Sequence, residues 1–158
     1  MSDEKGPSEE EQRDAERAAQ RLAERAAQAL AENDRTARHF GIRLEEVRPG
    51  YARMTMQVRA EMVNGHHICH GGMVFTLADT AFAYSCNSYN DNTVAAAASI
   101  DFLAAAREGD ELTAVATELW RTRRNGIYEI TVTNQRDERI ALFRGRSYRI
   151  DGQLASAD

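Results

Sequence analysis

The stretch Asn64-Gly-His-His-Ile-Cys-His-Gly-Gly-Met-Val-Phe-Thr-Leu-Ala-Asp79 is the most informative part of this chain, together with the apolar run that continues to about Asn87. Between residues 71 and 90 the one charged side chain is Asp79. The apolar residues occupy every face of a 3.6-residue helical wheel, so we expect a helix that is buried almost all round. Polar residues interrupt the run before it reaches the roughly 20 apolar residues that a membrane span needs.

Asp79 is a carboxylate in the middle of this expected helix. A buried carboxylate is costly unless it is paired, neutralised or functional. No Lys or Arg lies within two helical turns of Asp79 along the sequence. Asp79 is therefore a candidate catalytic base or nucleophile, and the alternative is a carboxylate satisfied by a distant partner or by water.

The residues His70-Gly71-Gly72 lie where this helix should begin. The first N–H groups of a helix have no partner within the helix, and glycine lets another molecule approach the backbone closely. The positive end of the helix dipole also favours negative charge at this point. These properties are those of an oxyanion hole, which stabilises the charge that develops on a carbonyl oxygen.

The separation of Gly71 and Asp79 restricts how they can act together. Eight residues of helix span about 12 Å, whereas both groups must come within about 3 Å of one reacting carbonyl group. A second copy of the helix running antiparallel would bring Gly71 of one subunit near Asp79 of the other. We therefore expect an active site shared across a two-fold dimer.

The pattern Asn64-Gly65-His66-x-x-Cys69-His70-Gly71-Gly72-x-x-Phe75-x-Leu77-Ala78-Asp79 resembles the signature of the hotdog-fold thioesterases. It is most similar to the phenylacetate-degradation (PaaI-like) acyl-CoA thioesterases. Further matches follow in order at residues 81–87, 100–103, 126–128 and 141–145, and the resemblance covers roughly residues 22–152.

This resemblance implies an α+β hotdog fold, in which an antiparallel β-sheet wraps around one long central helix. It also implies dimers that commonly pair into tetramers. In the family, the residue matching Asp79 is the base or nucleophile, and the glycine matching Gly71 polarises the thioester carbonyl. The residues matching Asn64 and His70 help to position the substrate or the water.

The implied reaction is hydrolysis of an acyl-CoA to the acid and free CoA, with phenylacetyl-CoA or an oxygenated relative as the substrate. We expect the central helix and the alanine-rich strand after it to line the acyl pocket. Arginine suits the CoA phosphates because its guanidinium binds them in a bidentate fork. The candidate substrate-binding residues are Gly72, Phe75, Phe82, Phe102, Arg123 and Arg124. The aromatic residues are equally explained as core, and each arginine as a solvated strand end.

The remaining chain suggests one domain with short extensions. We assign residues 1–21 to a polar, partly disordered helical extension, residues 22–152 to the thioesterase domain and residues 153–158 to a tail. Ser8 and Glu11 have the spacing of a capping box that opens a helix from Glu9 to about Glu32. We expect a short helical turn ending at Gly41 and a hairpin closed near Asn125-Gly126. The expected strands span residues 42–47, 51–58, 94–103, 111–122, 126–133 and 139–150.

Composition limits the partners. The net charge of −5 and the pI of about 5.4 give no reason to expect nucleic acid as a partner. Two cysteines without a signal peptide predict free thiols in a cytoplasmic protein. We expect an acyl-CoA substrate, a homodimer that pairs into a dimer of dimers, no membrane association and no cofactor.

Other interpretations of the motif remain. His66, His67, Cys69 and His70 include zinc-ligand types, but they crowd into one loop without a second cluster, so we expect no metal. Cys69 as a nucleophile would need an activating partner, and neighbouring side chains in extended backbone diverge. The rival functions are a hotdog enoyl-CoA hydratase and a non-catalytic acyl-CoA-binding protein.

Overall fold

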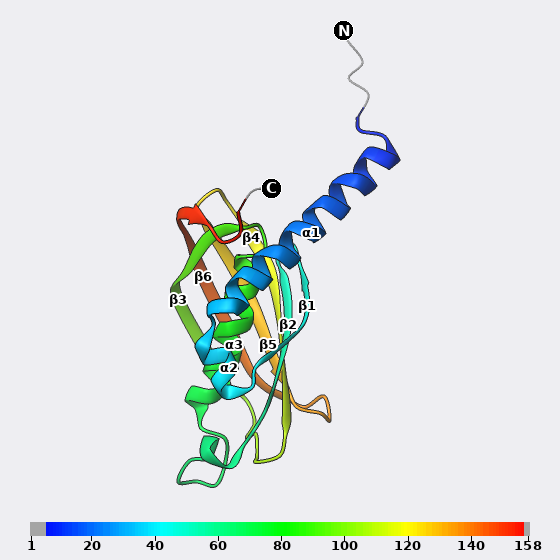
Figure 1. Cartoon of the computed structure of the whole chain (residues 1–158). Helices are drawn as coiled ribbons and strands as arrows, with labels where there is room; N and C mark the ends of the chain where they lie inside the picture. The colour runs from blue at the N-terminus through cyan, green and yellow to red at the C-terminus, as the bar shows by residue number, and fades with distance from the viewer. Residues whose placement is uncertain (1–5, 157–158) are drawn as a thin grey trace.

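A six-stranded antiparallel sheet wraps around helix α3 (Gly71–Cys86) in the computed structural model, which describes residues 6–156 (Figure 1). The strand order is β1-β2-β4-β5-β6-β3, and all neighbouring pairs are antiparallel. The strands are β1 (Arg43–Arg48), β2 (Tyr51–Gln57), β3 (Asp91–Phe102), β4 (Glu111–Arg121), β5 (Asn125–Thr133) and β6 (Arg139–Gln153). This arrangement confirms the expected α+β hotdog fold.

Helix α3 is enclosed on nearly all sides, as its composition predicted. It contacts all six strands, and Gly72 is its one exposed residue. Leu77, Ala78 and Ala81 are fully buried and contribute to one continuous hydrophobic core. A 3₁₀ turn, η1 (Ala60–Met62), precedes the loop that leads into α3.

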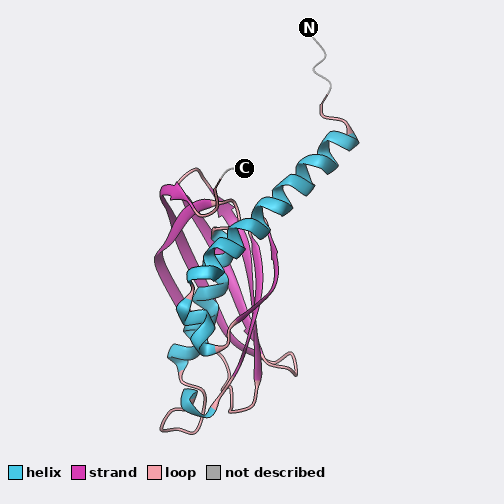
Figure 2. Ribbon diagram, viewed as in Figure 1, coloured by secondary structure: helices cyan, strands magenta, loops and turns pink. Residues whose placement is uncertain are grey.

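The N-terminal helix α1 (Glu9–Asn33) begins with the predicted capping box between Ser8 and Glu11. Its N-terminal half is exposed and projects beyond the sheet, and its first buried residue is Ala23 (Figures 1 and 2). The helix runs without a break across residues 21 and 22. Residues 1–5 of the proposed extension and residues 157–158 of the proposed tail lie outside the described residues.

Helix α2 (Arg35–Phe40) follows and ends at Gly41, as expected, with the glycine in the left-handed conformation (φ 65°). Asp34 caps its first turn, because its carboxylate accepts a hydrogen bond from the Ala37 N–H at 2.9 Å. Within residues 6–156, no helix is both long and apolar enough to cross a bilayer.

Strand β2 shows the predicted alternation, since Ala52, Met54 and Met56 are fully buried. Strands β4 and β5 form the predicted hairpin, but Asn125-Gly126 lies inside β5 and residues 122–124 form the turn. A Cβ at Gly126 would lie 2.7 Å from the Tyr128 ring and 2.9 Å from Ser147 Oγ. Glycine is thus required here by close packing and not by a turn.

Strand β3 forms one edge of the sheet and pairs with β6 alone. It begins three residues earlier than predicted, at Asp91 instead of Val94. Residues 94–99, a valine followed by four alanines and a serine, are exposed on both faces of the strand. A long, exposed edge strand with small side chains is a template for pairing with another strand.

Candidate active site

The N-terminus of α3 carries a free backbone donor at Gly71. The His70 imidazole caps the helix, because its Nδ1 accepts a hydrogen bond from the Gly72 N–H at 2.9 Å. Within residues 6–156 no group accepts a hydrogen bond from the Gly71 N–H. Gly71 therefore offers the unpaired N–H that an oxyanion hole requires, whereas the N–H of Gly72 is already engaged.

The loop before α3 is fixed by its own hydrogen bonds. The Asn64 carboxamide oxygen accepts hydrogen bonds from the N–H groups of His66 at 2.9 Å and Ile68 at 3.4 Å. Asn64 Nδ2 makes no hydrogen bond with the described residues. The Cys69 N–H donates to Ala106 O at 2.8 Å, which joins this loop to the segment after β3.

Gly71 opens onto a pocket of about 410 Å³. The ring of Phe102, which is 54% exposed, lies over the glycine, and a Cβ at Gly71 would lie 2.9 Å from Phe102 Cζ. Any larger residue at position 71 would therefore force this ring to move. The pocket is lined by Asn64, Ile68, Cys69, Gly71, Val74, Phe102, Leu103, Ala104, Ala105, Ala106 and Ile140.

Asp79 lies in a different pocket, of about 290 Å³. Its carboxylate is partly buried and makes no hydrogen bond or ion pair with any described residue. Burial raises the pKa of Asp79 above the usual range of an aspartate, because desolvation disfavours the charged form. The lining consists of Leu30, Asp79, Phe82, Ala83, Cys86, Asn87, Asn92, Thr93, Val94, Ala95 and Leu154.

The two pockets lie towards opposite ends of β3. Val94 and Ala95, near the start of the strand, line the Asp79 pocket, whereas Phe102, at its end, lines the Gly71 pocket. One chain thus holds Gly71 and Asp79 in separate pockets, as the helical spacing predicted. No sequence signal indicated that Leu154 lines the Asp79 pocket, and Leu30 was notable only as one of two large apolar residues in α1.

The three candidate phenylalanines lie in different surroundings. Phe82 is almost fully buried against Tyr128 and Phe143, yet it also lines the Asp79 pocket. Phe75 is partly buried, and its ring packs edge-on against Phe143 at a centroid distance of 5.1 Å. Phe102 is the one that covers Gly71.

Arg123 and Arg124 lie in the exposed turn between β4 and β5 and line a polar pocket with Arg121 and Arg149. Arg149 pairs with Asp91 at 2.9 Å, and Arg121 lies 3.6 Å from Glu118. Arg124 Nη1 donates to the Tyr148 hydroxyl at 3.4 Å. Cys86 and Thr93 line both this pocket and the Asp79 pocket, so the two are neighbours.

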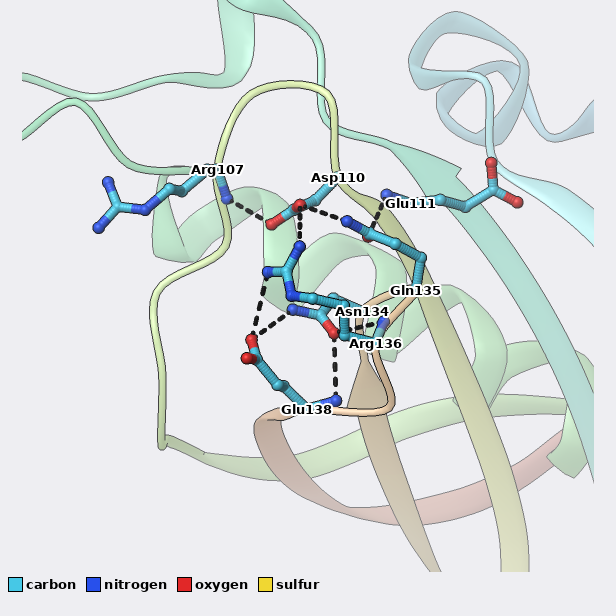
Figure 3. Close-up of polar contacts among 7 residues, drawn as sticks. All are labelled: Arg107, Asp110, Glu111, Asn134, Gln135, Arg136 and Glu138. Carbon is cyan, nitrogen blue, oxygen red and sulfur yellow. Dashed lines mark hydrogen bonds and ion pairs between the residues drawn. The ribbon is translucent and has the colours of Figure 1, made fainter.

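A cluster of polar residues holds the segment after β3 in place (Figure 3). The buried carboxylate of Asp110 accepts hydrogen bonds from Gln135 Nε2 at 2.8 Å and from the Arg107 N–H at 2.9 Å. These hydrogen bonds and the nearby Arg136 lower the pKa of Asp110. The cluster thereby anchors residues 103–106, which form one wall of the Gly71 pocket, to the turn between β5 and β6.

The two cysteines are buried free thiols. Burial, with a smaller effect of Asp110, raises the pKa of Cys69 to about 11, and burial raises that of Cys86 to about 12. Neither thiol is therefore activated as a nucleophile at neutral pH. In the part of the chain that the structure describes, no group of three or more His, Cys, Asp or Glu side chains is arranged to hold a metal ion.

Comparison with known proteins gives a consistent result. The thioesterase superfamily matches residues 66–141. The acyl-coenzyme A thioesterase PaaI of Escherichia coli (strain K12) is 48% identical over 122 residues, which cover 77% of this chain and 87% of that protein.

Solved structures agree with this similarity. The structure of the E. coli PaaI protein from the phenylacetic acid degradation operon matches with a TM-score of 0.84 and 46% identity, over 85% of this chain and 98% of that chain. A hypothetical thioesterase from Streptococcus pneumoniae TIGR4, solved with coenzyme A, matches with a TM-score of 0.67 and 25% identity. That match covers 71% of this chain and 87% of the streptococcal chain.

Proposed function

Because this chain belongs to the PaaI-like acyl-CoA thioesterases of the hotdog fold, we propose that it hydrolyses phenylacetyl-CoA or a ring-hydroxylated arylacetyl-CoA to the acid and free CoA. The observation that carries this proposal is the state of Asp79. This carboxylate lies in a largely apolar pocket without a partner among the described residues, and its pKa is raised. Such a combination of desolvation and isolation is typical of a catalytic group.

In the proposed reaction, Asp79 takes a proton from a water molecule, and the water oxygen attacks the thioester carbonyl carbon. Attack by the carboxylate itself is the alternative, through a covalent anhydride. The Gly71 N–H binds the carbonyl oxygen as it becomes negative, which the N-terminus of α3 favours. The C–S bond then breaks, and the proton held by Asp79 passes to the thiolate of CoA.

His70 and Asn64 are assigned supporting roles. His70 accepts a hydrogen bond from the Gly72 N–H and so holds the first turn of α3, which leaves the Gly71 N–H as the unpaired donor. Asn64 fixes the loop through its carboxamide oxygen, and its free Nδ2 is available to a substrate or a water. Both side chains would thus position groups for the reaction without bonding to the reacting carbon.

The proposal places each active site between two subunits. If β3 pairs antiparallel with its copy about Ala98, Val94 of one strand lies opposite Phe102 of the other. The Asp79 pocket of one subunit then meets the Gly71 pocket of its partner. The exposed, alanine-rich edge of β3 supports this dimer, because small side chains allow close approach. Two such dimers would form the tetramer.

Arg123 and Arg124 are proposed to contact the phosphates of CoA. Their pocket borders the Asp79 pocket, and the guanidinium groups of both are exposed in the turn. Arg121 and Arg149 are less available because each is close to a carboxylate. The aromatic candidates Phe82 and Phe102 would contact the acyl group from two sides of the shared site.

A hydrolysis assay with thiol detection across a panel of acyl-CoA substrates tests the function. We expect free CoA to be released fastest from arylacetyl-CoA substrates. Hydration of an enoyl-CoA without thiol release would instead identify a hydratase. Saturable binding of acyl-CoA without turnover would identify a binding protein and contradict the proposal.

A further inference from the structure

The loop after α3 holds the segment after β6 through Asn90. This residue adopts the left-handed conformation (φ 63°) and is only 3% exposed. Its Nδ2 donates a hydrogen bond to Ala155 O at 3.0 Å, and its Oδ1 accepts one from the Ala155 N–H at 2.8 Å. The buried carboxamide therefore replaces a strand partner for Ala155, beyond the end of β6.

Two neighbouring contacts strengthen this connection. Asn92 Nδ2 donates to Asp151 O at 3.2 Å, and Arg149 forms an ion pair with Asp91 at 2.9 Å. Gly152, near the end of β6, has φ 100°, a backbone conformation that residues with a side chain rarely adopt. Figure 1 shows the segment after β6, in dark red, turning back from the end of the sheet.

The consequence of this connection is the position of Leu154. Leu154 is partly buried and lines the pocket that contains Asp79, where Leu30 of α1 and Phe82 of α3 are further apolar walls. Leu30 and Leu154 both lie outside residues 66–141, the part matched by the thioesterase superfamily. The pocket volume of about 290 Å³ is close to the lower limit of small-molecule sites, which is about 300 Å³.

We propose that Leu154 is a specificity-determining wall of the acyl pocket, held in place by Asn90, and that it favours acyl groups with a single aromatic ring over larger ones. This inference rests on the proposed function, because it assigns the Asp79 pocket to the acyl group. Leu154 contacts the ring, and Asn90 acts as a positioning residue through Ala155. A small acyl group such as acetyl does not extend to this wall.

The first test replaces Leu154 with alanine and measures kcat/KM for three substrates of increasing size. We expect phenylacetyl-CoA hydrolysis to fall about tenfold, the low end for loss of one hydrophobic contact, and acetyl-CoA hydrolysis to stay within about twofold. The ratio of kcat/KM for naphthylacetyl-CoA to kcat/KM for phenylacetyl-CoA should rise about tenfold, because the pocket becomes larger. Leu44→Ala is the matched control, since Leu44 is 36% exposed in β1, at the opposite edge of the sheet from β3.

The second test removes the connection and leaves Leu154 intact. Asn90→Gly deletes both hydrogen bonds to Ala155 and tolerates the left-handed backbone. We expect this variant to show the same change in substrate ratio as Leu154→Ala. The double variant should show no further change, because both lesions act on one contact.

The inference would be overturned if the kcat/KM ratios between substrates were the same in the wild type, Leu154→Ala and Asn90→Gly. If Asn90→Gly lowered the melting temperature and left these ratios unchanged, Asn90 would only stabilise the fold. Affinity for a non-hydrolysable phenylacetyl-CoA thioether gives a second readout. It should weaken about tenfold in Leu154→Ala and stay unchanged in Leu44→Ala. If the wild-type protein hydrolysed none of the three substrates, the proposed function would be refuted. The affinities for the thioether would still test whether Leu154 contacts the acyl group.

Discussion

Replacement of Asp79 by asparagine keeps the shape of the side chain and removes its charge and its basicity. If Asp79 is the base or nucleophile, turnover of phenylacetyl-CoA should fall at least about 10²-fold, which corresponds to about 2.7 kcal/mol of lost transition-state stabilisation. The loss should appear in kcat. The affinity for substrate should change little, because the amide occupies the same volume in the pocket.

The same substitution should not destabilise the protein. No described residue hydrogen-bonds to the Asp79 carboxylate, so the change breaks no contact. The pKa of Asp79 is raised in the folded state, so its charge opposes folding once the pH exceeds the unfolded value of 3.8. The melting temperature of Asp79→Asn at pH 7 should therefore equal or exceed that of the wild type. Because solvent screens this partly buried group, the gain should stay below about 4 °C, the effect of about 1 kcal/mol.

Thermal unfolding at pH 7 and pH 4, with hydrolysis assays on the same samples, checks both expectations. The difference in melting temperature should shrink as the pH falls from 7 to 4, because the raised pKa of Asp79 favours proton uptake by the folded wild type. Asp79→Ala is the matched variant that also removes volume, and it should lose stability as well as activity. Near-wild-type turnover of Asp79→Asn would refute the mechanism. A clear fall in its melting temperature would show that the carboxylate has a structural partner.

Gly145→Ala should lower the free energy of unfolding by about 1–3 kcal/mol, because its Cβ would lie 2.6 Å from Phe82 Cε1; denaturant unfolding measures this loss. Asp110→Asn should lower the free energy of unfolding by about 1–3 kcal/mol at pH 7, because its hydrogen bonds would be weakened. Hydrogen bonds from Gln135 and the backbone lower the pKa of Asp110 below 3.8 in the folded state. The carboxylate therefore stabilises the fold above pH 3.8, and this stabilisation is lost as the pH falls further. The melting temperatures of wild type and variant should converge in acid. Deletion of residues 1–19 should leave turnover and melting temperature nearly unchanged, because the described residues among them are exposed, and a change in either would reveal an unrecognised contact.

Much of the fold was predictable because its signals are local. The apolar run after Gly71 predicted a buried central helix, and the alternation of Ala52, Met54 and Met56 predicted the buried face of β2. The hairpin of β4 and β5 was predicted correctly, but its turn was placed near Asn125-Gly126, a common turn signal, and lies instead at residues 122–124. The glycine is needed instead for close approach to the Tyr128 ring on the same strand and to Ser147, its partner across the sheet in β6. Such a contact depends on strand register, which the sequence pattern does not reveal.

The candidate site was predictable to a similar degree. The isolation of Asp79 follows from the absence of neighbouring cations in sequence, and the structure adds that no distant residue among those described pairs with it. The free N–H of Gly71 follows from its place at the helix start. Leu154 was not predictable as a wall of the Asp79 pocket, because its position depends on hydrogen bonds between Asn90 and Ala155, 65 residues apart.

The shared active site is tested most directly by mixing two inactive variants. Asp79→Asn lacks the carboxylate, and Gly71→Val blocks the oxyanion donor, since its Cβ alone would lie 2.9 Å from the Phe102 ring. A mixed dimer carries both lesions in one site and leaves the other site intact. After dissociation and reassociation, about half of the dimers should be mixed, and about a quarter of wild-type activity should return. No recovery, with mixed dimers confirmed by mass spectrometry, would place both groups in one subunit and contradict the account.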